Sequence, residues 1–176
     1  MKKSVVFLVL IVFCLVMLKA DSARKPAVTK MNITRIDIDQ RGYFNYHGQV
    51  SNMIVRGEEV VWICNAPFTV YFGKESPIVS NSKGIPLPWG STMRGIQSQT
   101  LDGLLRNPPP DLCKTSMNSL KSLREKLKSG QYFIARAWVS RNALSGKYKY
   151  IIAAYVKGRV WVDDPEDIID PPPRMR

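Results

Sequence analysis

A succession of short segments rich in β-branched and aromatic residues restricts this chain to a largely β architecture. Turn residues such as Gly42, Gly57 and Pro67 separate the segments at short intervals, which is typical of strands joined by tight turns. The predicted strands are residues 33–38, 43–46, 49–55, 59–64, 68–72, 131–139, 148–156 and 158–162. This pattern predicts an all-β fold, either a sandwich or a barrel.

Residues 73–130 interrupt this pattern and are predicted to be an insertion. Prolines and glycines are frequent between residues 73 and 111, which leaves room for one short strand near residues 92–96. A helix is predicted at residues 116–128, because apolar residues recur at helical spacing from Met117 to Leu127 and Gly130 follows as a stop signal. We therefore expect a long loop carrying one helix.

The N-terminal residues have the composition of an export signal. Lys2 and Lys3 precede an apolar run from Val5 to Leu18, which is shorter than the roughly 20 residues that span a bilayer. We expect residues 1–20 to be a signal peptide or an N-terminal anchor, residues 21–31 a linker, residues 32–165 a single domain and residues 166–176 a proline-rich tail with acidic and basic residues. The chain is thus expected to be exported, to the periplasm, the extracellular space or the envelope.

The cysteines fit an exported protein. Without residues 1–20, Cys64 and Cys113 remain as an even pair, and such a pair can form a disulfide in an oxidising compartment. The alternative is that Cys64, inside an apolar strand, is a buried small residue and that Cys113 is a free thiol in a loop.

Positive charge is concentrated in the second half of the chain. The formal net charge is +12, and residues 74–159 contain fifteen Lys and Arg against four Asp and Glu. A basic surface on an exported protein can attract anionic lipid or polysaccharide, whereas nucleic acid is not expected in that compartment. The candidate binding surface consists of Trp89, Arg94, Arg106, Lys114, Lys121, Lys147, Lys149, Lys157 and Arg159. The alternative is an ordinary solvated surface.

Two segments resemble the cupredoxin family. Residues 57–72 contain a glycine turn and a strand ending in Trp62-Ile63-Cys64-Asn65, followed by a short corner and another strand, which is similar to the family signature that precedes a copper-ligand histidine. Residues 146–162 resemble the final hairpin of the family, which is written Gly-x-Tyr-x-Tyr-x-Cys-x-x-His. The ending at residues 162–171 is similar to that of uncharacterised, metal-free exported relatives. The resemblance implies a Greek-key, cupredoxin-like β-sandwich.

The resemblance places other side chains at the copper-ligand positions. Phe68 stands at the first histidine position, Ile152 at the cysteine position and Tyr155 at the second histidine position. The resemblance therefore implies that these three side chains form a packed apolar plug where the family holds a metal.

The histidine content argues independently against a blue-copper centre. Such a centre needs two imidazoles and a thiolate, and the chain contains one histidine, His47. We expect no metal and no cofactor. The alternative is a soft Cu(I) site formed by His47, Cys64 and a methionine.

No catalytic motif is present in the sequence. A serine triad would have to combine His47 with Ser51 and with Asp37 or Asp39, without support from any motif. We therefore expect a non-catalytic binding or accessory domain with an unknown partner in the envelope. The alternative is a basic protein that binds an anionic lipid or polysaccharide surface.

Overall fold

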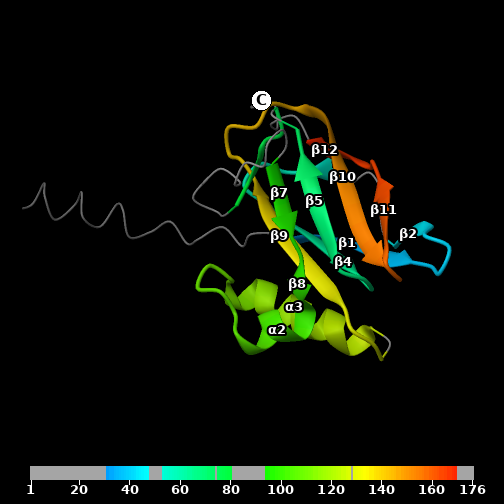
Figure 1. Cartoon of the computed structure of the whole chain (residues 1–176). Helices are drawn as coiled ribbons and strands as arrows, with labels where there is room; N and C mark the ends of the chain where they lie inside the picture. Colours follow the sequence, from blue (N-terminus) through cyan, green and yellow to red (C-terminus); the bar gives the residue numbers. More distant parts are fainter. Residues whose placement is uncertain (1–30, 48–52, 74, 81–93, 128, 170–176) are drawn as a thin grey trace, which may run out of the picture.

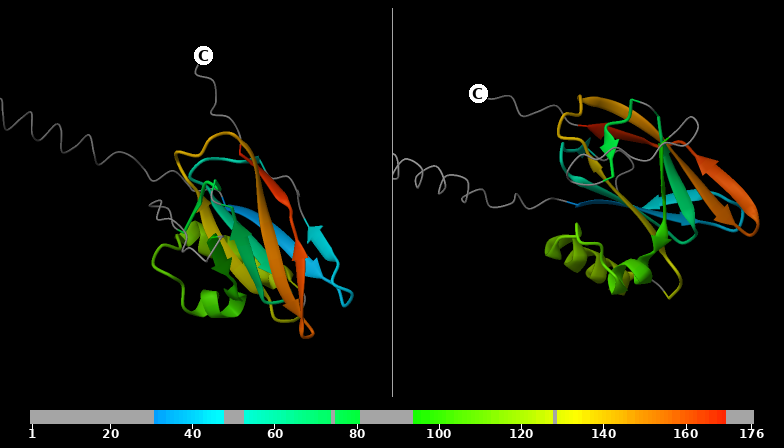
Figure 2. Two further views of the ribbon diagram at one scale, coloured as in Figure 1. Left: turned by 45° about the horizontal axis from the view of Figure 1, so that its top comes forward. Right: turned by 60° about the vertical axis from the view of Figure 1, so that its left-hand side comes forward.

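The computed structural model describes residues 31–47, 53–73, 75–80, 94–127 and 129–169. These residues form two β-sheets packed face to face, and two helices lie against the outside of one sheet (Figure 1). The further views in Figure 2 show the same two layers with the helices to one side. The predicted all-β sandwich class is confirmed at this level.

Sheet 1 contains the helix-covered face. Its strands lie in the order β2-β1-β4-β9-β6, and β8 also pairs with β9. Strands β1 and β4 are parallel, and the other pairs in this sheet are antiparallel. The bounds are β1 (Met31–Ile38), β2 (Phe44–His47), β4 (Glu59–Cys64), β6 (Ile78–Val79), β8 (Gln99–Thr100) and β9 (Phe133–Val139).

Sheet 2 forms the other layer. Its strands lie in the order β3-β12-β10-β5-β7, and β11 also pairs with β10. Its bounds are β3 (Met53–Ile54), β5 (Phe68–Phe72), β7 (Arg94–Gln97), β10 (Gly146–Val156), β11 (Arg159–Asp163) and β12 (Glu166–Ile169). The long strand β10 pairs with β5 on one edge, and with β12 and then β11 on the other edge.

Strand β4 explains how the layers are held together. All six of its residues are buried, because one side of the strand faces sheet 2 and the other side faces the helices. Trp62 belongs to the cluster between the sheets, where its ring lies 5.7 Å from that of Phe72 and 5.6 Å from that of Tyr150. Val61 and Ile63 belong to the second cluster, under the helices. An uninterrupted apolar strand is the expected sequence for such a doubly covered position.

The helices α2 (Leu101–Arg106) and α3 (Lys114–Lys126) pack against each other and against sheet 1. Leu104 and Leu120 are buried in the cluster that also contains Ile63. Arg124 donates to both carboxylate oxygens of Asp102, with its Nε 2.7 Å from Oδ1 and its Nη2 3.2 Å from Oδ2. This arrangement orients the two helices over sheet 1.

The insertion is more regular than predicted. The expected short strand is β7, and the expected helix is α3, which begins and ends two residues earlier than predicted. The expectation of little regular structure between residues 73 and 111 is wrong, since β6, β8 and α2 lie there in addition to β7. Strands β6 and β8 could not be predicted, because each is only two residues long and is formed by pairing with the distant strand β9.

The boundary predicted at residue 165 is also wrong. Strand β12 follows Pro165 and pairs with β10 and β3, so sheet 2 extends to Ile169. Residues 1–30 and 170–176, which include the predicted signal and most of the linker and tail, lie outside the described residues. In the described part of the chain, neither helix has the length and apolar character needed to cross a membrane.

Candidate functional site

The two sheets differ in what covers their outer faces. Helices α2 and α3 cover sheet 1, whereas none of the described elements covers the outer face of sheet 2 (Figure 1). Tyr155, Val160 and Val162 are exposed there, at 55%, 64% and 61%. Exposed apolar side chains gathered on one sheet face are typical of a contact surface.

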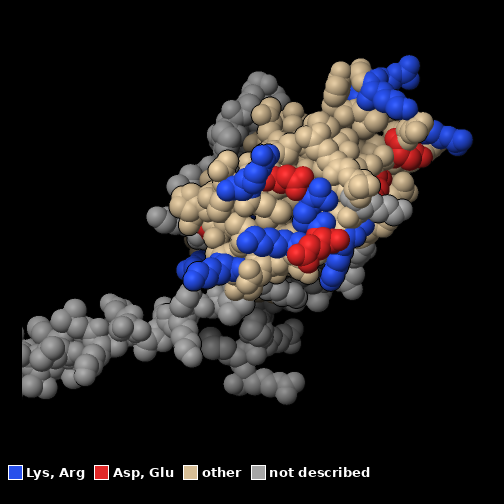
Figure 3. Space-filling view, turned by 90° about the horizontal axis from the view of Figure 1, so that it is seen from below, with Lys and Arg blue, Asp and Glu red and all other residues tan. Residues whose placement is uncertain are grey.

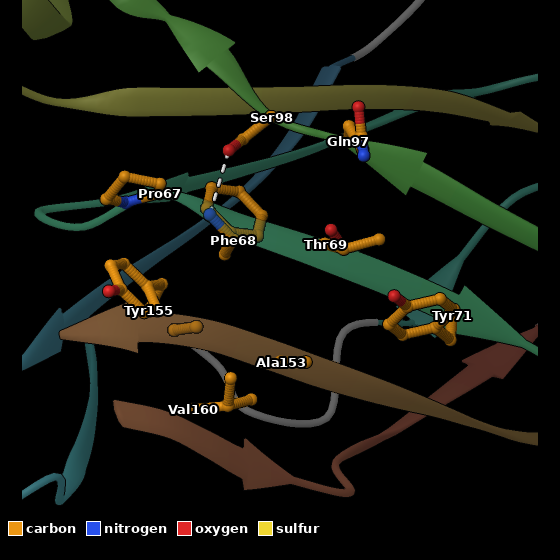
Figure 4. Close-up of a pocket in the computed structure, with 10 residues that line it drawn as sticks. Pro67, Phe68, Thr69, Tyr71, Gln97, Ser98, Ala153, Tyr155 and Val160 are labelled. Carbon is orange, nitrogen blue, oxygen red and sulfur yellow. Dashed lines mark hydrogen bonds between the residues drawn. The ribbon is translucent and has the colours of Figure 1, made fainter. Parts of the chain in front are cut away.

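An open groove of about 300 Å³ runs along this outer face (Figure 4). It is formed by neighbouring strands of sheet 2 and by the corner before β5. Its lining residues are Pro67, Phe68, Thr69, Tyr71, Gln97, Ser98, Ala153, Ala154, Tyr155 and Val160. The volume is at the lower limit for small-molecule sites, which begin at roughly 300 Å³ and are usually enclosed. An open groove of this kind suits an extended segment better than a compact ligand.

Strand alternation and local hydrogen bonds position the groove. Thr69 and Tyr71 of β5 and Ala153 and Tyr155 of β10 point outward, because their neighbours in sequence point into the core. At one end, Ser98 accepts a hydrogen bond at its Oγ from the Phe68 N–H, 2.9 Å away, as Figure 4 shows.

A second backbone contact closes the same end of the groove. The Tyr155 N–H donates to the Pro67 carbonyl oxygen at 2.9 Å. This end of the groove is therefore held by hydrogen bonds from the backbone N–H groups of Phe68 and Tyr155.

Basic side chains lie along two strands of sheet 2 and in the turn between them, and acidic residues of the same sheet lie beside some of them. Lys147, Lys149, Lys157 and Arg159 are exposed and lie on β10, on β11 or in the turn between them. Lys149 Nζ lies 3.9 Å from Asp164 Oδ2, in a pair whose side chains are both largely exposed. Such a pair contributes little attraction, about 0 to 1 kcal/mol, so Lys149 keeps its ammonium group accessible.

The other residues predicted to form the binding surface do not lie beside these four basic residues of sheet 2. Arg106, Lys114 and Lys121 are exposed on the helices that cover sheet 1, on the opposite side of the sandwich. Figure 3 shows the side of the molecule where the helices lie, and there Lys and Arg alternate with Asp and Glu. Arg94 lies in β7, but its side chain and the whole of Trp89 are outside the described residues. The predicted binding residues are thus divided between two faces.

The predicted apolar plug forms only in part. Phe68 and Ile152 are buried in the cluster between the sheets, and Phe68 pairs across the strands with Ala154. Tyr155 does not join them and is exposed on the outer face. The prediction for Tyr155 is wrong because β10 remains extended from Ile152 to Val156, and residues three apart in a strand face opposite sides.

The residues at these positions do not fit copper. Phe68 and Ile152 have hydrocarbon side chains and cannot donate to a metal. His47 and Cys64 do not form the alternative Cu(I) site either, because Cys64 faces the sandwich interior while His47 is 51% exposed at its side chain on the outer side of sheet 1. Burial raises the pKa of the Cys64 thiol to about 12, which disfavours the thiolate that a metal would need.

His47 instead contacts a carboxylate on the surface. Its Nε2 lies 2.8 Å from Asp37 Oδ2, and the same oxygen accepts from Arg35 Nη2 at 2.6 Å. Asp39 accepts at Oδ1 from the backbone N–H groups of the following turn, and Ser51 lies outside the described residues. Of the three residues that a serine triad would need, His47 and Asp37 are therefore in contact, and Ser51 is not among the described residues.

A buried ionic network lies under the helices. Arg136 Nε lies 2.5 Å from Glu59 Oε1, and Ser116 Oγ donates to Glu59 Oε2 at 2.9 Å. The guanidinium of Arg136 also lies 5.0 Å from the ring centroid of Trp138. Both charged side chains are almost fully buried, so the network links β4, β9 and α3 and is structural.

The two cysteines are free and do not form the predicted disulfide. Cys64 is buried between the sheets, whereas Cys113 caps the N-terminus of α3 on the other side of sheet 1. Cys113 Sγ accepts from the Ser116 N–H at 3.4 Å and lies 3.2 Å from Ser116 Oγ. The contact with the Ser116 side chain has the largest effect and the bond from its backbone N–H the next largest, and both lower the pKa of the Cys113 thiol.

Sequence reasoning missed most of the residues that form the groove. Tyr71, Gln97, Ser98 and Val160 were not singled out, although alternation in the hairpin could have indicated Val160. Which sheet face lies open depends on where the helices pack, and no local pattern gives that. No protein-family model, curated protein or solved structure matches the chain.

Proposed function

We propose that this chain is a non-catalytic, exported binding domain that uses the outer face of sheet 2 to hold an acidic, partly apolar segment of a partner protein. The observation that carries the proposal is the open groove with Tyr155 and Val160, on the sheet face that the helices leave uncovered. Tyrosine is enriched at protein interfaces, because its ring is apolar and its hydroxyl is polar.

The lining of the groove supports a binding role. It supplies rings, methyl groups, hydroxyls and one amide from Gln97. Acid–base catalysis generally uses a group that changes protonation near neutral pH, and none of the described lining side chains belongs to the carboxylate, imidazole or amine classes. The groove is suited to contact and hydrogen bonding.

The basic residues of sheet 2 support the choice of an acidic partner. Lys147, Lys149, Lys157 and Arg159 are exposed on β10, on β11 or in the turn between them, and opposite charge on a partner would speed encounter and fix orientation. The domain would then recognise a segment by its apolar side chains in the groove and its carboxylates at these basic residues.

We further propose that the domain is a cupredoxin-like Greek-key sandwich that has lost its copper ligands. The proximity of Phe68 and Ile152 in one apolar cluster supports this origin. Titration of the purified protein with Cu(II) and Cu(I) salts tests it. A saturable, stoichiometric copper species would contradict the loss of the centre.

Selection from a library of random linear peptides tests the binding proposal. We expect enriched peptides to contain acidic and apolar residues, and Tyr155→Ser or Lys149→Glu to weaken their binding about tenfold or more. Lys121→Glu on α3 is the matched control and should leave binding unchanged. Peptides that bind equally well to all three variants would contradict the assigned surface.

A second candidate is an anionic lipid surface. The observation that favours it is the β10–β11 hairpin, where exposed Tyr155 and Val160 lie close to the charged Lys157 and Arg159. Vesicles containing phosphatidylglycerol should retain the protein at low salt and release it at physiological salt, whereas phosphatidylcholine vesicles should not retain it. Salt-insensitive or absent retention would favour the protein partner.

A further inference from the structure

Strand β11 has an edge that no described strand occupies. It pairs with β10 through the register Val156–Arg159, Ala154–Trp161 and Ile152–Asp163, and among the described strands it has no other partner. In Figure 1 it lies at the margin of sheet 2, on the far side of β10 from β5 and β7.

The turn before β11 determines which backbone groups face this edge. Lys157 and Gly158 have positive φ angles of 50° and 80°, as a two-residue type I′ turn requires. Such a turn places a hydrogen bond between the residues on either side of it, Val156 and Arg159. Because hydrogen-bonded and non-hydrogen-bonded pairs alternate, Val160 and Val162 direct their N–H and C=O groups away from β10.

The side chains along this edge are complementary to those of a second β11. If two copies run antiparallel about Trp161, Val160 lies opposite Val162 of the other copy, and both valines are exposed in the single chain. In the same register Arg159 at one end lies opposite Asp163 at the other end. Opposite charges and β-branched pairs in directly opposed positions stabilise sheet pairing.

Asp163 is held in place for such a contact. Its Oδ2 accepts a hydrogen bond from Tyr46 Oη at 2.6 Å, and its Oδ1 accepts one from the Asp164 N–H at 3.0 Å. Each carboxylate oxygen retains a further acceptor position, so the residue can also receive a guanidinium. Arg159 is exposed.

We propose that β11 is a homodimerisation edge. Two copies pair antiparallel through residues 159–163, with Trp161 at the two-fold axis and four backbone hydrogen bonds formed by Val160 and Val162 of the two chains. The two copies of sheet 2 then become one continuous sheet, and their outer faces join. The edge suits a second copy better than an unrelated strand, because in the antiparallel register Arg159 of each copy lies opposite Asp163 of the other copy.

Sedimentation equilibrium of the full chain tests this proposal. We expect a reversible dimer of twice 20.0 kDa. Arg159→Asp places like charges opposite each other at both ends and should raise the dimer Kd about tenfold or more. Lys121→Asp makes the same change of charge on α3, and it should leave the dimer Kd unchanged.

Two substitutions at Val162 test the backbone pairing itself. Val162→Pro removes an N–H that faces the open edge while leaving the ladder to β10 intact, as edge strands tolerate, and it should abolish dimerisation. Val162→Thr keeps the N–H and the branched side chain, and it should retain the dimer. A wild-type chain that stays monomeric at every accessible concentration would overturn the proposal. So would a dimer that neither Arg159→Asp nor Val162→Pro weakens.

Discussion

Tyr155 and Val160 are cross-strand partners in the β10–β11 hairpin, and both side chains lie exposed on the outer face of sheet 2. On sheet 1, by contrast, the outer face around Val61, Ile63 and Ile134 is buried under α2 and α3. This difference gives the domain one face that serves stability and one face that is free for contact. Substitutions on the two faces should accordingly have different consequences.

Phe68 should be important for stability, whereas Tyr155 should not. Phe68 is 4% exposed in the cluster between the sheets, so Phe68→Ala should lower the free energy of unfolding by about 3 kcal/mol or more. Tyr155→Ala is the matched control and should cost about 1 kcal/mol or less, because the ring is 55% exposed and its main contact is one cross-strand pair. Urea denaturation of the two variants measures both. A cost below about 1 kcal/mol for Phe68→Ala would mean that the side chain is not packed as described.

The buried pair of Glu59 and Arg136 should be sensitive to the loss of either partner. Glu59→Ala leaves the guanidinium of Arg136 buried without its carboxylate and should cost about 3 to 5 kcal/mol. Arg35→Ala, which removes a more exposed partner of Asp37, should cost about 1 kcal/mol or less. Chemical denaturation compares the two. Equal losses would contradict the distinction between a buried and a surface ion pair.

The two described thiols should differ strongly in reactivity. Hydrogen bonds with the side chain and the backbone of Ser116 lower the pKa of the exposed Cys113 thiol, while burial raises the pKa of Cys64 to about 12. Iodoacetamide should therefore modify Cys113 in the folded protein at neutral pH and leave Cys64 unmodified, as peptide mass spectrometry can resolve. Ser116→Ala should shift the pH dependence of Cys113 alkylation upward. Faster modification of Cys64 would contradict the assignment.

Stability should fall at alkaline pH. Burial, together with the hydrogen bond to Asp163, raises the pKa of Tyr46 far above its usual value, and burial raises the pKa of Cys64 to about 12. Both groups stay protonated in the folded chain after the unfolded chain has lost those protons, at about pH 8.5 for Cys and about 10 for Tyr. Their contribution is complete below these values and decreases as the pH rises.

Each of the two groups should lower the free energy of unfolding by up to about 1.4 kcal/mol per pH unit in its range. Urea denaturation measured as a function of pH follows this loss. Tyr46→Phe should make the decline above about pH 10 shallower. An unchanged slope in that variant would show that Tyr46 is not the residue responsible.

The sequence predicted the strands whose pattern is local. Residues 59–64 and 68–72 were predicted with their observed bounds, because an apolar run and an alternating run are separated by a proline corner. Helix α2 could not be predicted, since it is short and contains Gly103. Its start depends on Thr100, whose Oγ1 accepts from the Gly103 N–H at 3.2 Å. Strand β12 was missed because it follows Pro165 and begins with two acidic residues.

The candidate site was less predictable than the fold. The groove combines β5, β7 and the β10–β11 hairpin, and these three parts come together only through long-range pairing. The lysines at positions 147, 149 and 157 were predicted from charge alone, and the sequence could not separate them from Lys114 and Lys121 on the opposite side. The resemblance to the copper-ligand motif predicts that Tyr155 lies in the core beside Ile152. That prediction fails because β10 is extended there, and residues three apart in an extended strand face opposite sides.

The binding face can be tested directly in cells that make the protein. A photoreactive phenylalanine analogue at position 155 would report a partner on sheet 2, and the same analogue at position 121 on α3 is the control. We expect an adduct with another protein at position 155 and none at position 121, with a mass that differs from that of two copies of the chain joined together. Equal adducts at both positions, or an adduct at position 121 alone, would contradict the assignment of the binding surface to sheet 2.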